Sequence, residues 1–262
     1  MIRRILASIL PRSAMPLARN AYALAYGLRD WSRPVDAPVP IAPAKLRYRV
    51  GAIDPIDYLA IGQRCAQDIR RAAEKSGVHW TALSDVLDFG CGAGRTLVWL
   101  SGSGPRLHAC DRDEECVSWC QANIPDVTVR VNDPAPPLPF EDDAFDLVYA
   151  VSVFTHLDES EQDAWLRELR RVTRPHGIGV FSFHGASLAK QLSPENHQRL
   201  ETHGILALPV RGLWGLFPTY YNTFHTESYV REHWTRFGPV LEIEARGMNG
   251  HQDLVVLRKE TN

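Results

Sequence analysis

The chain has no apolar run long enough to cross a membrane and no excess of basic residues. A membrane-spanning helix needs about 20 consecutive apolar residues, and no run in these 262 residues approaches that length. With 29 lysines and arginines against 31 aspartates and glutamates, the formal net charge is -2. A duplex nucleic-acid binder usually carries a basic excess that neutralises phosphates. We therefore expect neither a conventional transmembrane helix nor a nucleic-acid partner.

Cysteine is also scarce, and its spacing does not suit a disulfide framework. The five cysteines are odd in number, and no two of them form a Cys-x-x-Cys pair. This pattern argues against disulfides and against a thiolate zinc site. No cluster of carboxylates has metal-ligand spacing either, so we expect no metal. Cys116 and Cys120 are four residues apart, which predicts two small buried side chains on one helix face. A reducing cytoplasm is the compartment that fits best.

Acidic residues are missing from the first 29 positions, which carry five arginines among scattered isoleucines and leucines. Pro11 interrupts the apolar centre that a secretory signal needs. Three alternatives stay open for this arm. It is a helix that makes a peripheral contact with an anionic membrane surface, an arm docked on its own domain or on a partner, or a mitochondrial presequence.

Four prolines between residues 33 and 43 predict an extended linker. We therefore divide the chain into an amphipathic arm with its linker, residues 1–44, and one domain, residues 45–262. At the start of that domain, residues 45–51 alternate like a short edge strand or an extended segment. Residues 55–76 repeat apolar side chains at helical spacing and predict a helix.

From residue 85 onward, short apolar runs alternate with amphipathic segments. Strands are expected at residues 86–89, 106–110, 127–131, 145–151, 178–183, 240–245 and 254–257. Strand–helix alternation predicts an α/β fold, here a Rossmann-like doubly wound, mainly parallel seven-stranded sheet with an antiparallel last strand. Residues 185–224 break the rhythm and are taken as an insertion. Its aromatic segment, 214–224, is either a flap packed on the sheet or a lid over an acceptor pocket.

The most informative stretch is Val86–Arg95, where a strand runs into three glycines and then a helix. Glycines let a ligand approach the backbone, and a helix start offers amide donors. About twenty residues after the loop, Asp111 ends the next strand, where a carboxylate can bind ribose hydroxyls. Arg95 stands where a dinucleotide fingerprint has its third small residue. An NAD(P)-dependent oxidoreductase is therefore the less favoured alternative.

With this loop and the segments after it, the chain resembles the class I S-adenosylmethionine-dependent methyltransferases, in particular methyltransferase type 11/12/25-like domains. The resemblance is carried by Leu87–Arg95 with Asp111 after it, and by residues 132–140, 145–157 and 166–177. It implies a doubly wound fold, S-adenosyl-L-methionine as the cofactor, and methyl transfer as the reaction.

The resemblance also implies which residues meet the cofactor. They are Asp88, Gly90, Gly92, Gly94, Asp111, Arg112, Asn132, Asp133 and Ser152. The glycines and Asp88 would hold the methionyl and ribose end, and Asp111 the ribose hydroxyls. Asn132 or Asp133 would meet the adenine, and Pro134 stands where the family usually has an acid, so both candidates stay open. Ser152 would border the methyl-transfer point.

The methyl acceptor is expected to be a small molecule, a lipid-linked intermediate or a glycan, methylated on oxygen. The chain lacks the Pro-Pro-Tyr type motif of enzymes that methylate base amino groups. A hydroxyl must lose a proton, and histidine suits the role of general base. His184, at the end of the fifth strand, is the predicted base, and His156, after the fourth strand, is the second candidate. For His156 two other roles stay open, which are binding the methionyl part of the cofactor and shaping the loop. A catalytically silent subunit that binds S-adenosylmethionine is the alternative from another functional class.

Overall fold

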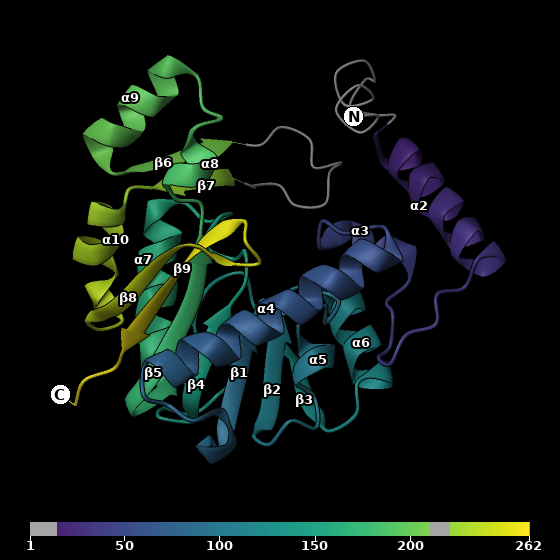
Figure 1. Ribbon diagram of the computed structural model, residues 1–262, viewed down its shortest axis with the longest axis horizontal. Helices are drawn as coiled ribbons and strands as arrows, with labels where there is room; N and C mark the ends of the chain where they lie inside the picture. Colours follow the sequence, from purple (N-terminus) through teal and green to yellow (C-terminus); the bar gives the residue numbers. More distant parts are fainter. Residues whose placement is uncertain (1–14, 210–220, 262) are drawn as a thin grey trace.

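A seven-stranded sheet forms the centre of the molecule (Figure 1). The computed structural model describes residues 15–209 and 221–261. The strands lie in the order β3-β2-β1-β4-β5-β9-β8. Their bounds are β1 Asp85–Phe89, β2 Arg106–Asp111, β3 Val127–Val131, β4 Phe145–Ala150, β5 Thr173–Phe183, β8 Val240–Met248 and β9 Gln252–Arg258. The strands β1 to β5 pair in parallel, and β9 is antiparallel to both of its neighbours, which confirms the predicted fold class.

Helices cover both faces of this sheet, because its central strands are apolar on both sides. The helices are α4 Pro55–Lys75, α5 Leu97–Leu100, α6 Glu114–Asn123, α7 Glu159–Val172 and α10 Glu227–His233, with 3-10 turns at Trp80–Ala82 and Trp234–Arg236. One face packs against α4, α5 and α6, and the other packs against α7 and α10. Every residue of β1 is buried, as this two-sided cover requires.

Capping residues fix where the helices begin near the carboxyl ends of the strands. The Asp113 carboxylate accepts hydrogen bonds from the backbone N–H groups of Glu115 and Cys116 and starts α6 just after β2. Asp158 and Glu161 form a capping box that starts α7 after β4. Both helices therefore begin at the sheet edge where an open α/β sheet binds its ligands.

The edge strand expected at residues 45–51 was wrong, because this segment is the helix α3 (Ala44–Arg49). The alternation of basic and apolar residues was misleading, since Arg47 is buried beside Leu46 and Tyr48. Its guanidinium donates to the backbone oxygens of Ala42 and Ile53 at 2.6 and 2.8 Å. In a half-buried strand, every second side chain is exposed. Here Arg47 is buried, because it donates to backbone carbonyls, so the exposure does not alternate.

Two other expectations need adjustment. The strand expected to begin at residue 178 begins at Thr173, because α7 ends at Val172 and Thr173 pairs with Phe145 across a register irregularity. The insertion contains helices α8 (Ala186–Ala189) and α9 (Pro194–His203) and the antiparallel pair β6 (Ile205–Pro209) and β7 (Tyr221–His225). Most of the aromatic segment, residues 214–220, lies outside the described residues, so the flap and lid alternatives both stay predictions.

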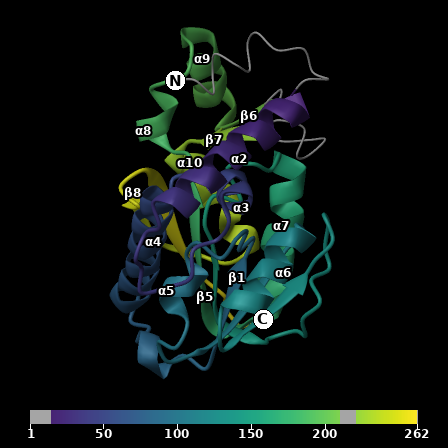
Figure 2. The same cartoon turned by 90° about the vertical axis from the view of Figure 1, so that its right-hand side faces the viewer.

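The N-terminal arm contains the helix α2 (Met15–Ser32), which lies at the outer edge of the molecule beside α3 (Figures 1 and 2). Arg29 donates to Asp54 at 2.8 Å, Asp30 accepts from the buried Arg47, and the Tyr22 and Tyr48 rings meet edge to face. Residues 1–14 lie outside the described part. Of the helices that the structure describes, none is both long and apolar enough to cross a membrane.

Candidate functional site

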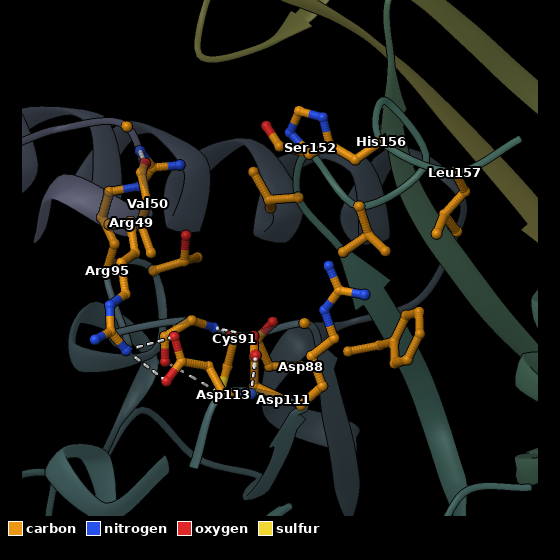
Figure 3. A pocket seen from close by; sticks show the side chains of 18 of the residues that line it. Arg49, Val50, Asp88, Cys91, Arg95, Asp111, Asp113, Ser152, His156 and Leu157 are labelled. Atoms are coloured by element: carbon orange, nitrogen blue, oxygen red, sulfur yellow. Dashed lines mark hydrogen bonds and ion pairs between the residues drawn. The ribbon is translucent and has the colours of Figure 1, made fainter. Parts of the chain in front are cut away.

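A cavity of about 660 Å³ lies at the carboxyl ends of β1, β2 and β4 (Figure 3). The chain order of the strands reverses between β1 and β4, and open α/β sheets bind ligands at such a point. The predicted site residues that line the cavity are Asp88, Gly90, Gly92, Asp111, Arg112, Asn132, Asp133, Ser152 and His156. Figure 3 shows Ser152 and His156 on one side and Asp88 and Asp111 on the other.

The glycine turn after β1 needs glycine at two of the cavity positions. Gly90 and Gly92 have φ angles of +77° and +51°, which L side chains rarely adopt. A Cβ atom on Gly90 would lie 2.5 Å from Val153, and one on Gly92 would lie 2.5 Å from Val50. Side chains at either position would therefore push on the walls that frame the cavity.

The third predicted glycine faces a different part of the structure. A Cβ atom on Gly94 would lie 2.5 Å from Ile124 and 3.0 Å from the Cys120 sulfur, at the end of α6 and just beyond it. Gly94 is not among the described residues that line the cavity. It lets the turn pack closely on α6, and its contact with the cofactor stays a prediction.

A buried carboxyl group, Asp88, and a half-buried one, Asp111, lie where β1 and β2 end. Asp111 accepts hydrogen bonds from the backbone N–H groups of Gly92, at 2.7 Å, and Asp113, at 2.8 Å. Burial raises the pKa of Asp111. Burial also raises the pKa of Asp88 to about 7, and the nearby Asp111 contributes to this rise. Two carboxyl groups therefore line this side of the cavity, and the glycine turn holds one of them, Asp111.

Asn132 presents an unsatisfied acceptor at the cavity wall. Its side-chain nitrogen donates to the Asp133 backbone oxygen at 2.7 Å. Its side-chain oxygen is buried and has no hydrogen-bond partner within the described part of the chain. Buried amide oxygens normally have a donor, so this atom fits the amino group of a ligand such as an adenine.

Sequence reasoning missed Gln252, a polar residue at the start of β9 that joins two serines. Its side-chain oxygen accepts from the Ser182 hydroxyl at 2.7 Å, and its nitrogen donates to the Ser152 hydroxyl at 2.8 Å. Ser152 has a φ angle of +63°, which is unusual for a residue with a side chain. The network holds this strained turn in place after β4. The signal for Gln252 was its position two residues before the apolar run Leu254–Leu257.

His156 follows that turn and lines the cavity as a neutral imidazole. Its Nδ1 lies 3.0 Å from the Tyr221 backbone oxygen. Because a carbonyl oxygen only accepts, Nδ1 carries the proton and the lone pair is on Nε2. Burial lowers the pKa of His156 to about 4, with a smaller contribution from the charge on Arg112. The ring is therefore uncharged near neutral pH.

The structure places His184 behind the cavity rather than in its described wall. Its ring packs against Phe224 with centroids 5.3 Å apart. Its Nε2 is 3.4 Å from the Gln252 side-chain nitrogen. Burial lowers the pKa of His184 to about 4. The predicted base therefore sits next to the network of Gln252, and the structure does not bring it into the cavity beside His156.

The segment after α3 closes one side of the cavity, which the sequence did not indicate. One Arg49 nitrogen donates to both carboxylate oxygens of Asp113 at 2.7 Å. The Arg95 guanidinium donates to the Val50 backbone oxygen at 2.8 Å. Arg95, which disfavoured a dinucleotide fingerprint, thus fastens this segment over the glycine turn.

Comparison with known proteins agrees with this arrangement. Residues 86–177 match the methyltransferase domain family. Methyltransferase GfsG of Streptomyces halstedii is 29% identical over 132 residues, which are 48% of this chain and 44% of that protein. A "probable S-adenosylmethionine-dependent methyltransferase" of Mycolicibacterium smegmatis is 34% identical over 104 residues, 40% of this chain and 39% of that protein. The matched segments thus span less than half the length of these relatives.

Solved structures share the fold at low sequence identity. Magnesium protoporphyrin IX methyltransferase of Synechocystis, solved with bound SAH, has a TM-score of 0.53 at 19% identity and covers 93% of this chain and 99% of its own. The 1,6-didemethyltoxoflavin-N1-methyltransferase of Burkholderia thailandensis has a TM-score of 0.55 at 17% identity, over 87% of this chain and 94% of its own. The family match shows that residues 86–177 belong to a methyltransferase domain. The strand order and the glycine turn agree with the fold of the class I S-adenosylmethionine-dependent methyltransferases.

Proposed function

We propose that the protein transfers a methyl group from S-adenosylmethionine to a hydroxyl oxygen of a small-molecule, lipid-linked or glycan acceptor. The observation that carries this proposal is the state of His156. It lines the same cavity as Asp111 and Asn132, and its Nδ1 proton is directed at the Tyr221 carbonyl oxygen. His156 therefore lines the cavity with its lone pair on Nε2, the atom that can accept a proton.

The cavity residues fit the cofactor group by group. The unsatisfied Asn132 oxygen would accept from the adenine amino group, which favours Asn132 over the exposed Asp133. Asp111 would accept hydrogen bonds from the ribose hydroxyls. The backbone at Gly90 and Gly92 would lie against the rest of the cofactor. When bound, S-adenosylmethionine supplies a methyl group on a positively charged sulfur, which is a good leaving group.

Because the leaving group is good, much of the catalysis can come from holding the acceptor in line. A hydroxyl nucleophile must also lose its proton, and we assign its acceptance to Nε2 of His156. The hydrogen bond to Tyr221 fixes the ring and its tautomer. We assign this role to His156 rather than to His184, because of these two histidines His156 alone is among the described cavity-wall residues.

The acceptor end of the cavity combines apolar and polar side chains. Val153, Leu157 and Tyr221 line it together with Asn222 and His251. Such a mixture suits an acceptor with an apolar body and a few polar groups. The two structurally similar enzymes are named for small heterocyclic molecules, magnesium protoporphyrin IX and 1,6-didemethyltoxoflavin. This supports a small-molecule or lipid-linked acceptor over a macromolecular one.

The test is the release of S-adenosylhomocysteine in the presence of a library of alcohols, phenols, lipid-linked intermediates and glycans. We expect turnover with a hydroxyl acceptor, reduced about 10²-fold or more in His156→Ala, with S-adenosylmethionine affinity preserved. His184→Ala is the matched control and should retain most of the turnover. Equal loss in both variants would refute the assignment of the base. Binding of S-adenosylmethionine without turnover on any acceptor would favour a catalytically silent subunit.

A further inference from the structure

One face of α2 carries a row of exposed apolar side chains. Among the described side chains of this helix, the large apolar ones that are exposed are Leu17, Leu24, Leu28 and Trp31, with 73%, 64%, 59% and 84% of their surface accessible. At about 100° per residue, these four positions fall within an arc of about 60° on the helix. We call this row the α2 ridge. Apolar residues scattered singly on a surface need no explanation, but four aligned on one helix do.

The opposite face of α2 is the one that holds it to the domain. Ala23 is buried, Tyr22 packs edge to face against Tyr48, and Asp30 pairs with the buried Arg47. On the same helical projection these docking residues lie about 110–150° away from the centre of the ridge. The fixed contacts of α2 therefore turn the ridge away from the protein and toward its surroundings. Figures 1 and 2 show the helix at the outer edge of the molecule.

The chemistry around the ridge indicates what it meets. Between Leu17 and Trp31, the residues that flank the row, Asn20, Ala21, Ala25 and Gly27, carry no charge. The first 29 residues of the chain contain five arginines and no acid. The one acid within α2, Asp30, lies on the docking face and pairs with Arg47. An apolar helix face ending in a tryptophan, in an arginine-rich segment with no acid beside that face, is typical of helices that lie in the surface of an anionic membrane.

A second copy of the chain is the other occupant to consider. A stable protein interface buries roughly 800 Å² on each partner, built around well-packed anchors. A single row of four side chains on an otherwise small and polar helix face offers less. The lack of acidic residues around the ridge also gives two copies no opposite charge to pair. Both points favour a lipid surface, whose acyl chains accept a narrow ridge without shape complementarity.

We propose that the α2 ridge binds the surface of an anionic lipid bilayer, with Leu17, Leu24, Leu28 and Trp31 entering its interfacial layer. The proposal does not depend on the methyl acceptor. It has a geometric consequence for the site, because α2 packs on α3 and the residues that end and follow α3, Arg49 to Gly51, line the cavity. A bilayer at the ridge would therefore lie beside the part of the domain that closes the cavity.

The test is flotation of the full-length chain with phosphatidylcholine vesicles that contain phosphatidylglycerol, and with pure phosphatidylcholine vesicles. We expect flotation with the anionic vesicles, weaker at high salt, and about tenfold or more loss of partitioning in Leu24→Gln/Leu28→Gln. Leu241→Gln is the matched control, because Leu241 is an exposed leucine on β8. Circular dichroism and S-adenosylmethionine affinity should be the same in all variants, which separates this test from the proposed function.

Three outcomes would overturn the proposal. The first is the absence of flotation with anionic vesicles. The second is flotation that the ridge variant and the Leu241 control reduce equally. The third is concentration-dependent dimerisation, measured by sedimentation without vesicles, that the ridge variant abolishes. That last result would assign the ridge to a second copy of the chain.

Discussion

The Asp111 carboxylate accepts a hydrogen bond from the backbone N–H of Gly92, with 2.7 Å between the two atoms. This contact joins the end of β2 to the glycine turn that follows β1. The residue proposed to bind the ribose hydroxyls is therefore also a residue that shapes the loop against which the cofactor would lie. Asp111 keeps its second oxygen on the backbone N–H of Asp113, so both oxygens have fixed positions before any ligand binds.

Replacing Asp111 with alanine should weaken S-adenosylmethionine binding about tenfold or more. The ribose hydroxyls would lose a charged acceptor, and such hydrogen bonds contribute roughly 1.5–3 kcal/mol. Asp111→Asn retains an acceptor for the Gly92 N–H but loses the charge, so its affinity should be intermediate. Isothermal titration calorimetry checks both variants, with the exposed Asp36→Ala as the control. Unchanged affinity in a folded Asp111→Ala protein would show that the ribose site lies elsewhere.

Gly92→Val should abolish cofactor binding while the domain stays folded. The φ angle of +51° is strained for any side chain, and the new Cβ would lie 2.5 Å from Val50 in the cavity wall. Gly102→Ala is the matched control, because Gly102 has a φ of +69° but no atom within 4 Å of an added Cβ. It should lose about 1 kcal/mol of stability and no affinity. Calorimetry and thermal unfolding measure the two effects.

The contact with Val50 can be separated from backbone strain by a double variant. Gly92→Ala should lose affinity, and adding Val50→Ala should restore part of it, because the second change removes the atom that the new Cβ meets. If Val50→Ala restores nothing, strain in the turn alone accounts for the loss.

Arg49→Gln should lower the free energy of unfolding by about 1–3 kcal/mol and speed the release of S-adenosylmethionine. The variant removes a largely buried ion pair with Asp113 and a second ion pair with Glu115, which together hold the end of α3 beside the cavity. Arg174→Gln is the control, since Arg174 also bridges two acids, Asp85 and Asp146, but at the amino ends of the strands. Stopped-flow measurement should show faster release only for Arg49→Gln. Equal release rates in the two variants would mean that α3 does not close the cavity.

The fold could be predicted because the spacing of apolar residues and the positions of glycines in turns depend on the local conformation of the chain. Buried parallel strands appear as short apolar runs, and Gly90 and Gly92 mark two turn positions whose positive φ angles disfavour side chains. What escaped prediction depends on contacts between distant segments. The helix α3 owes its form to Arg47, whose partners Ala42, Ile53 and Asp30 cannot be inferred from its neighbours.

The candidate site also has residues that the sequence alone could place and residues that required the structure. Asp111 and Asn132 follow strands, so topology alone brings them to one edge of the sheet. The choice between His156 and His184 required the structure, because both follow strands and only the path of β7 supplies the Tyr221 carbonyl to one of them. Gln252 reaches the site from β9, and it lies 100 residues after Ser152 in the sequence. Its role emerges only when the last strand is placed between β5 and β8.

The final prediction concerns the pH dependence of methyl transfer. Burial lowers the pKa of His156 to about 4, against about 6.5 for an unperturbed histidine. A base works in its neutral form, so protonation of His156 should not reduce turnover until the pH falls toward about 4. Asp88, whose pKa burial raises to about 7, titrates nearer neutrality and can add its own limb to the profile. The kcat profile should therefore be recorded in both the wild type and Asp88→Asn.

In Asp88→Asn we expect kcat to stay level from about pH 8 to about pH 5, because the His156 imidazole of the folded protein is neutral throughout that range. The His156 ring resonances, assigned by their loss in His156→Gln, should not shift over the same range in the folded protein. In urea, where burial is removed, the same ring should titrate near the ordinary value of about 6.5. The contrary result is a fall of kcat near pH 6.5 in Asp88→Asn, at the same pH at which the His156 ring titrates in the folded protein. It would show that the imidazole is solvated and that the cavity does not hold it as the neutral base.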